Sequence, residues 1–193
     1  MPAKENTIAI PTRYGLFMSR FIVTAFGPDS YGIVARVTSA LAELNCNLAD
    51  STMSNLSGHF AMMLVVDGEV DEKSIFHSVQ SKCAELNLVV DVKQIDPAAS
   101  PTLDGDRYVL SVYGTDRPGI VAGICEVLAA HNANIFDLTT RVTESDLLQI
   151  YTMIMEIALA EGEDPQLLEM ALRAKAELLG VSCSLRAVDS EEL

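Results

Sequence analysis

Hydrophobic and polar residues alternate along short segments of the chain and then change to helical spacing. Residues 20–26 and 107–113 are rich in β-branched and aromatic side chains and end at glycine, which predicts strands. Helical spacing follows, as in Ile120, Ile124 and Leu128, and predicts amphipathic helices. Further strands are predicted at 47–54, 59–66, 88–95, 134–142, 149–158 and 181–188, and second helices at 71–86 and 164–179.

The predicted elements follow the order βαββαβ twice. This order is typical of an α+β, ferredoxin-like fold, in which two helices cover one face of an antiparallel four-stranded sheet. The other face stays without helices. If the faces that contain Thr24 and Ser111 are the helix-free ones, they still carry apolar and aromatic side chains. Such a face usually packs against a partner, either the other copy or a second subunit, and we expect a homodimer.

An internal repeat sets the domain organisation. The segment from Phe21 to Ser54 reappears as Tyr108 to Arg141. A repeat of this length exceeds the roughly 20 to 50 residues of a solenoid unit, so each copy is predicted to be a small domain. We expect an N-terminal extension at 1–17, domains at 18–96 and 107–189, a linker at 97–106 and an acidic tail at 190–193. Identical residues cluster at turns, among them Gly27/Gly114, Asp29/Asp116, Gly32/Gly119, Asn45/Asn132 and Asn47/Asn134.

The turn between the first strand and the first helix of each copy carries the candidate chemistry. Its sequence is GPDSYG at 27–32 and GTDRPG at 114–119, without the lysine and Ser/Thr of a phosphate-binding P-loop. A helix N-terminus there offers free N–H groups and partial positive charge to a small anion such as a carboxylate. Asp29 and Asp116 can complement an ammonium group. Together these groups favour an α-amino acid.

Asparagine and glycine complete the predicted sites. Asn47 and Asn134 open the second strand of each copy and are expected near the same end of the domain as the turn. An alternative is that both aspartates only cap helices and that the asparagines serve turns. Asn45 and Asn132 are expected to adopt the left-handed conformation at helix ends.

Composition excludes several classes of function. The chain has 13 Lys plus Arg against 27 Asp plus Glu, a formal net charge of -14, which would repel a nucleic-acid backbone. No apolar run reaches the roughly 18 residues of a membrane span, and residues 1–17 resemble neither a secretory signal nor a transit peptide. The four cysteines are far apart and favour buried reduced thiols. We expect a cytoplasmic protein without catalytic residues, metal or cofactor.

The residues of the second turn and its helix resemble an ACT domain, a small-molecule regulatory module with the βαββαβ fold. The resemblance rests on DRPGIV at 116–121, NANI at 132–135 and Asp137, and it covers most of the chain. Two such domains without a catalytic domain resemble the glycine cleavage system transcriptional repressor group. ACT domains bind amino acids between two modules, through the strand-to-helix turn and the start of the second strand. The resemblance therefore implies ligand binding by Asp29, Gly32, Asn47, Asp116, Gly119 and Asn134.

The leading hypothesis is a non-catalytic amino-acid sensor that acts on a regulatory protein partner rather than on DNA. An alternative is a stand-alone regulatory subunit of an amino-acid metabolic enzyme. A small acylphosphatase-like hydrolase would need a phosphate-binding arginine, for which Arg117 is the only candidate in the turns. The first copy has Ser30-Tyr31 where the second has Arg117-Pro118, so the two copies are not expected to have equal roles.

Overall fold

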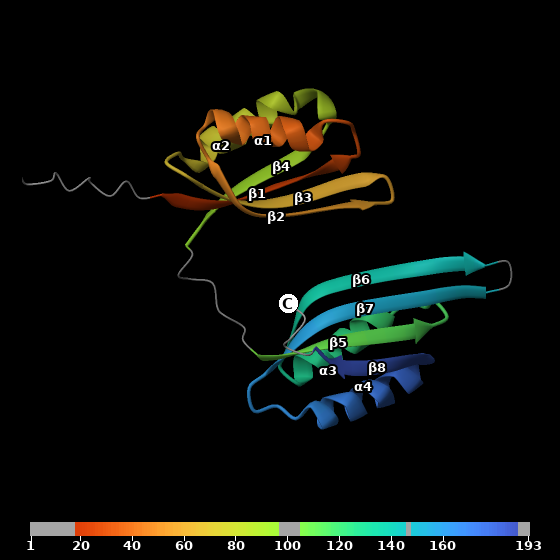
Figure 1. Cartoon of the computed structure of the whole chain (residues 1–193). Helices are drawn as coiled ribbons and strands as arrows, with labels where there is room; N and C mark the ends of the chain where they lie inside the picture. Colours follow the sequence, from red (N-terminus) through yellow and green to blue (C-terminus); the bar gives the residue numbers. More distant parts are fainter. Residues whose placement is uncertain (1–17, 97–104, 146–147, 189–193) are drawn as a thin grey trace, which may run out of the picture. The chain divides into compact units, whose positions relative to one another are not determined.

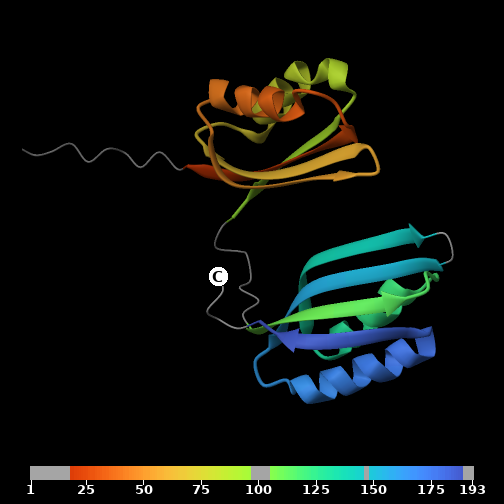
Figure 2. The same cartoon turned by 45° about the vertical axis from the view of Figure 1, so that its right-hand side comes forward.

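The computed structural model describes residues 18–96, 105–145 and 148–188. The chain divides into two compact units, residues 1–100 and 101–193, and each is described by itself (Figures 1 and 2). The expected extension 1–17, the acidic tail 190–193 and residues 97–104 of the expected linker lie outside the described residues.

The first unit is an antiparallel sheet of four strands in the order β2-β3-β1-β4, with both helices on one face (Figure 1). Along the chain its elements are β1 (Ser19–Pro28), α1 (Ile33–Glu43), β2 (Asn47–Leu56), β3 (His59–Gly68), α2 (Glu72–Lys82), the 3-10 helix η1 (Ala84–Leu86) and β4 (Val89–Ile95). The predicted helix 71–86 is thus shorter than expected. The chain tightens into η1 and turns at Asn87, which has a φ of 53°.

The second unit repeats this architecture with the strand order β6-β7-β5-β8 (Figure 2). Its elements are β5 (Gly105–Gly114), α3 (Ile120–Ala130), β6 (Ala133–Ser145), β7 (Leu148–Ala160), α4 (Pro165–Leu179) and β8 (Val181–Ala187). The expected linker therefore ends too late, because Gly105 and Asp106 already pair with β7. Both sheets confirm the predicted α+β, ferredoxin-like fold in tandem.

Alternation along the first strand of each unit decides which face is covered. Phe21, Val23 and Ala25 are buried beneath the helices, whereas Ile22 and Thr24 are half-buried and Phe26 is exposed. In β5 the buried residues are Leu110 and Val112. The faces with Thr24 and Ser111 are therefore the helix-free ones, which the alternation by itself left open.

The burial of α3 and the turns after α1 and α3 agree with the sequence pattern. In α3 the apolar residues Ile120, Ile124 and Leu128 are fully or almost fully buried, which matches their helical spacing. Asn45 and Asn132 have φ values of 53° and 50°, which confirms the predicted left-handed turns after α1 and α3.

Candidate ligand-binding turns

The turn from β1 to α1 leaves the N-terminus of the helix without a side-chain cap. Gly32 is the N-cap residue with φ 84° and ψ 6°, and no side chain accepts a hydrogen bond from the first turn of the helix. The N–H groups of that first turn therefore stay available to an anion from outside. A Cβ at Gly32 would meet nothing within 4 Å, so the positive φ rather than close packing requires glycine.

Asp29 is held by the β2–β3 hairpin rather than by the helix. Its backbone N–H donates to Gly58 O at 3.0 Å, and its Oδ2 accepts a hydrogen bond from Asn55 Nδ2 at 2.6 Å. Asp29 therefore does not cap α1. Sequence reasoning missed Asn55, although Asn55 lies just before the tight turn at Ser57 and Gly58, which both have positive φ.

The corresponding turn of the second unit has the same backbone conformation at its N-cap glycine, but its aspartate makes fewer hydrogen bonds. Gly119 is the uncapped N-cap of α3, with φ 95° and ψ -5°. The carboxylate of Asp116 makes no hydrogen bond with the described part of the chain. Burial, and to a smaller extent the charge of Asp116, raise the pKa of the Tyr151 hydroxyl, so this carboxylate lies near Tyr151. Neither aspartate caps its helix, so the alternative of simple capping is wrong for both.

Arg117 points toward the end of another helix. Its guanidinium lies 3.3 Å from the place that a Cβ of Gly180 would occupy, at the C-terminus of α4. A cation there complements the negative end of the helix dipole. This position gives Arg117 a structural role and weakens the acylphosphatase-like alternative.

The structure does not bring Asn47 to the first turn. Asn47 pairs with Asp67, and Asp67 pairs with Arg20 near the beginning of β1. The turn follows Pro28 at the other end of β1. At about 3.3 Å per residue, the two ends of the strand are roughly 25 Å apart. The expectation that Asn47 lies near Asp29 within one domain is wrong, because α1 returns the chain to the opposite end of the sheet before β2 begins.

Asn134 shows the same arrangement in the second unit. It pairs with Ala158, which pairs with Arg107 near the start of β5, whereas the turn with Asp116 follows Gly114 at the end of that strand. The separation is again roughly 23 Å along the strand. Asn134 is half-buried and Asn47 is exposed. Each domain therefore brings its aspartate and N-cap glycine together and keeps its asparagine apart from them.

Other chemistry in the described residues is sparse. No group of three or more His, Cys, Asp or Glu side chains within 18–96, 105–145 and 148–188 is placed to hold a metal ion. None of the helices in the same ranges has the length and apolar character of a membrane span. All four cysteines are free, and burial raises the pKa of each thiol, which makes them poor nucleophiles.

Two matches place the protein in a family defined by this fold and this turn. The ACT domain family matches residues 19–93 and again residues 108–170. The chain therefore belongs to the ACT-domain family and carries two such domains in tandem. This result confirms the resemblance inferred from the turn at 116–121 and from the helix exit at 132–135.

Three relatives show how far the similarity extends. The chain is 25% identical over 172 residues to the glycine cleavage system transcriptional repressor of Escherichia coli K12, covering 87% of this chain and 90% of that protein. It is 42% identical over 84 residues to a UPF0237 protein of Methanopyrus kandleri, covering 43% of this chain and 89% of the relative. The solved structure of an unknown protein from Galdieria sulphuraria superposes with a TM-score of 0.77 at 29% identity, covering 89% and 99% of the two chains. The similarity to a repressor over nearly the whole chain supports a regulatory role.

Proposed function

We propose that this protein is a non-catalytic regulator that binds an α-amino acid at its strand-to-helix turns. The observation that carries the proposal is the pair of uncapped helix N-termini at Gly32 and Gly119, each with an aspartate three residues earlier. The N–H groups would bind the carboxylate of the ligand, and Asp29 or Asp116 would accept hydrogen bonds from its ammonium group. Asn47 and Asn134 join such a site only where a second ACT domain brings them to the turn.

The second turn is the stronger candidate of the two. Asp116 has no hydrogen-bond partner in the described residues, whereas Asp29 already accepts a hydrogen bond from Asn55. A ligand at the first turn has to share that carboxylate with Asn55, and a ligand at the second turn does not. We therefore expect the second domain to bind the amino acid more tightly.

Titration calorimetry of the full chain against each of the twenty amino acids tests the proposal. We expect one or a few of them to bind, and Asp116→Asn to weaken that binding about 10-fold or more, since a hydrogen bond to a charged group contributes roughly 1.5 to 3 kcal/mol. Glu177→Gln, at an exposed position of α4, is the matched control and should bind normally. The absence of both heat and thermal shift with all twenty would refute amino-acid sensing.

The regulated process is proposed from the relative in Escherichia coli. That relative is a glycine cleavage system transcriptional repressor. The net charge of -14 argues that this chain acts through a protein rather than on DNA. A tagged chain that recovers a transcription regulator, with recovery changed by the ligand, would support this route. Recovery of a metabolic enzyme instead would support the alternative of a stand-alone regulatory subunit.

A further inference from the structure

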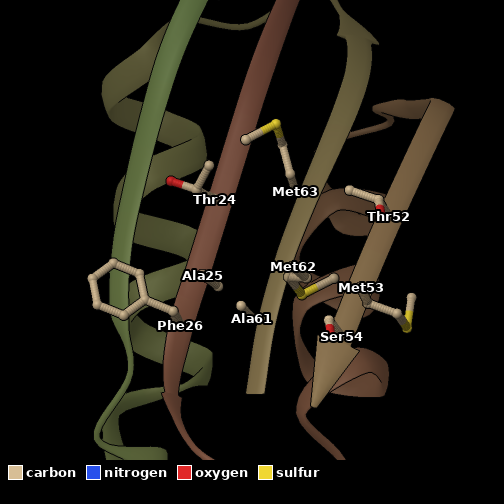
Figure 3. A pocket seen from close by; sticks show the side chains of 9 residues that line it. All are labelled: Thr24, Ala25, Phe26, Thr52, Met53, Ser54, Ala61, Met62 and Met63. Atoms are coloured by element: carbon tan, nitrogen blue, oxygen red, sulfur yellow. The ribbon is translucent and has the colours of Figure 1, made fainter. Parts of the chain in front are cut away.

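The helix-free face of the first domain has a hollow over β1, β2 and β3, toward the β2–β3 hairpin. The hollow measures about 340 Å³ and lies over Ala61, with Thr24, Phe26, Thr52, Ser54 and Met63 around it (Figure 3). Phe26 is 53% exposed and Met63 is 45% exposed, so two large apolar side chains project beside a small one. No residue that lines the hollow is charged, although the chain as a whole is strongly acidic.

Strand register arranges this face in rows. Each row crosses the sheet in the order β2, β3, β1, β4, because directly paired residues point to the same face. The three rows are Ser54, Ala61, Phe26, Val89; then Thr52, Met63, Thr24, Asp91; then Asp50, Val65, Ile22, Lys93.

We propose that a second copy of the chain covers this face with its own first-domain sheet, about a two-fold axis parallel to the strands. Such an axis keeps every row at its own level and reverses its order. β3 of one copy then lies over β1 of the other, and β2 lies over β4. A two-fold interface requires one surface to be complementary to itself, and the rows can be tested for that property.

The first row supplies shape complementarity. Reversal puts Phe26 of one copy over Ala61 of the other, and the same contact forms a second time across the axis. The projecting ring therefore enters the hollow, as side chains interdigitate between sheets packed about 10 Å apart. In the next row Met63 meets Thr24 of the second copy. Two sheets packed face to face are usually rotated by about 30° relative to each other. This rotation displaces the contacts close to the two-fold axis less than those far from it.

The third row supplies charge complementarity. Reversal puts Asp50 of one copy opposite Lys93 of the other, again twice, while Val65 meets Ile22. Within one chain these two charges lie on opposite edges of the sheet, three strand spacings or roughly 14 Å apart, so they cannot pair with each other. Asp50 Oδ1 accepts a hydrogen bond from Ser51 N at 2.7 Å, which leaves its other oxygen for a lysine.

The equivalent face of the second domain is less suited to this contact. Thr152 occupies the place of Ala61 in the row with Tyr113, so the hollow is partly filled. Glu156 takes the place of Val65 in the third row and forms an ion pair of 2.9 Å with Arg107, so a covering sheet would have to desolvate charge within that row. In the first domain the corresponding ion pair, Arg20 with Asp67, lies one row beyond the three rows. From the usual spacing between strands and the rise per residue, the first-domain face has a flat area of roughly 450 Å² per copy. An interface of this area is at the low end of the size of specific interfaces and suits a weak dimer.

Sedimentation velocity of the full chain over a range of concentrations tests the dimer. We expect reversible dimerisation, with Ala61→Glu raising the dissociation constant at least about 100-fold, because the hollow would be filled and charged. Thr152→Glu, at the equivalent position of the second domain, is the matched control and should leave the constant unchanged. A wild-type chain that stays monomeric up to millimolar concentration overturns the proposal, and so does an Ala61→Glu chain that dimerises normally.

Charge reversal distinguishes this face from any other dimer contact. Asp50→Lys and Lys93→Asp should each weaken the dimer about 10-fold, since each places like charges opposite each other twice. The double variant should return to within about threefold of the wild-type constant. Recovery of the dimer in the double variant requires positions 50 and 93 to meet across the interface. Failure of the double variant to recover, with both single variants weakened, contradicts the proposed pairing.

A fluorescence measurement covers the case in which a charged variant fails to fold. The chain has no tryptophan, so a single Phe26→Trp substitution gives an unambiguous signal. Its emission should shift to shorter wavelength as concentration rises through the dissociation constant. Tyr113→Trp at the equivalent exposed position should not shift with concentration. An unchanged emission at position 26 in a chain that does dimerise assigns the dimer to another surface.

Discussion

At the residue scale, comparison of the two copies separates two kinds of repeated glycine. A Cβ at Gly27 would lie 2.9 Å from Asn87 O, and a Cβ at Gly114 would lie 2.6 Å from Val181 Cγ1. These two glycines are required by close packing, Gly27 against Asn87 and Leu88 just before β4 and Gly114 against Val181 of β8. Gly32 and Gly119 face open space and are required by positive φ instead. Identity between copies therefore has a structural cause at all four positions, and a binding role must be argued from the exposed groups beside them.

Gly114→Ala should destabilise the second domain by about 1 to 3 kcal/mol, the usual cost of overpacking. The added methyl group would lie 2.6 Å from the Val181 side chain and 3.1 Å from its Cα, so a simple side-chain rotation does not relieve the contact. Urea unfolding of the full chain measures the change. Ser182→Ala, a neighbouring substitution that adds no atoms, is the control. A Gly114→Ala chain as stable as the wild type would show that β8 moves away freely.

At the element scale, the strands and helices could be predicted from periodicity, but the position of Asn47 could not be predicted correctly from the turn motif. The motif gives the order of the residues, whereas their distance depends on the return path of α1 and on strand register. Asn55 was missed for a related reason, since its bond to Asp29 joins a hairpin and a turn distant in sequence. Gly123 stands where the first copy has Arg36, and the sequence gives no reason for a glycine within a helix. The structure shows that a Cβ there would meet Lys175 and Leu179 of α4, at 2.8 and 3.0 Å.

The ion pair between β1 and β3 gives the sheet a pH dependence. Arg20 donates two hydrogen bonds to Asp67, at 2.7 and 2.9 Å, and thereby lowers the pKa of that carboxyl. A carboxyl with a lowered folded pKa adds stability above its unfolded value, near 3.9, and this stability is lost as pH falls through the folded pKa. Asp67→Asn should therefore be less stable than the wild type at pH 7, with a difference that shrinks toward pH 2.

Urea unfolding between pH 7 and pH 2 measures this difference. Glu69→Gln, an exposed acidic position close by in sequence, is the control and should follow the wild-type curve. A difference for Asp67→Asn that stays constant over the whole pH range would show that the ion pair does not cause it.

At the scale of the whole molecule, each unit has its own closed core. The first is built around residues such as Phe21, Leu64 and Ile75, and the second around Leu110, Ile124 and Met155, all with exposed fractions of 1% or less. Residues 18–96 and residues 105–189 should therefore each fold when expressed alone, with a single cooperative urea transition. Circular dichroism gives the measurement. A half that is unfolded by itself would contradict independent domains.

The hydrogen bond from Asn55 to Asp29 has a mechanical consequence. It joins the only acidic side chain of the first turn to the tip of the β2–β3 hairpin, and β2 is an exposed edge strand of the sheet. A cation that binds this carboxylate competes with the Asn55 amide for it. Ligand binding at the turn would therefore weaken the hydrogen bond that holds the hairpin tip. Amide hydrogen exchange at residues 55–59 would then show reduced protection.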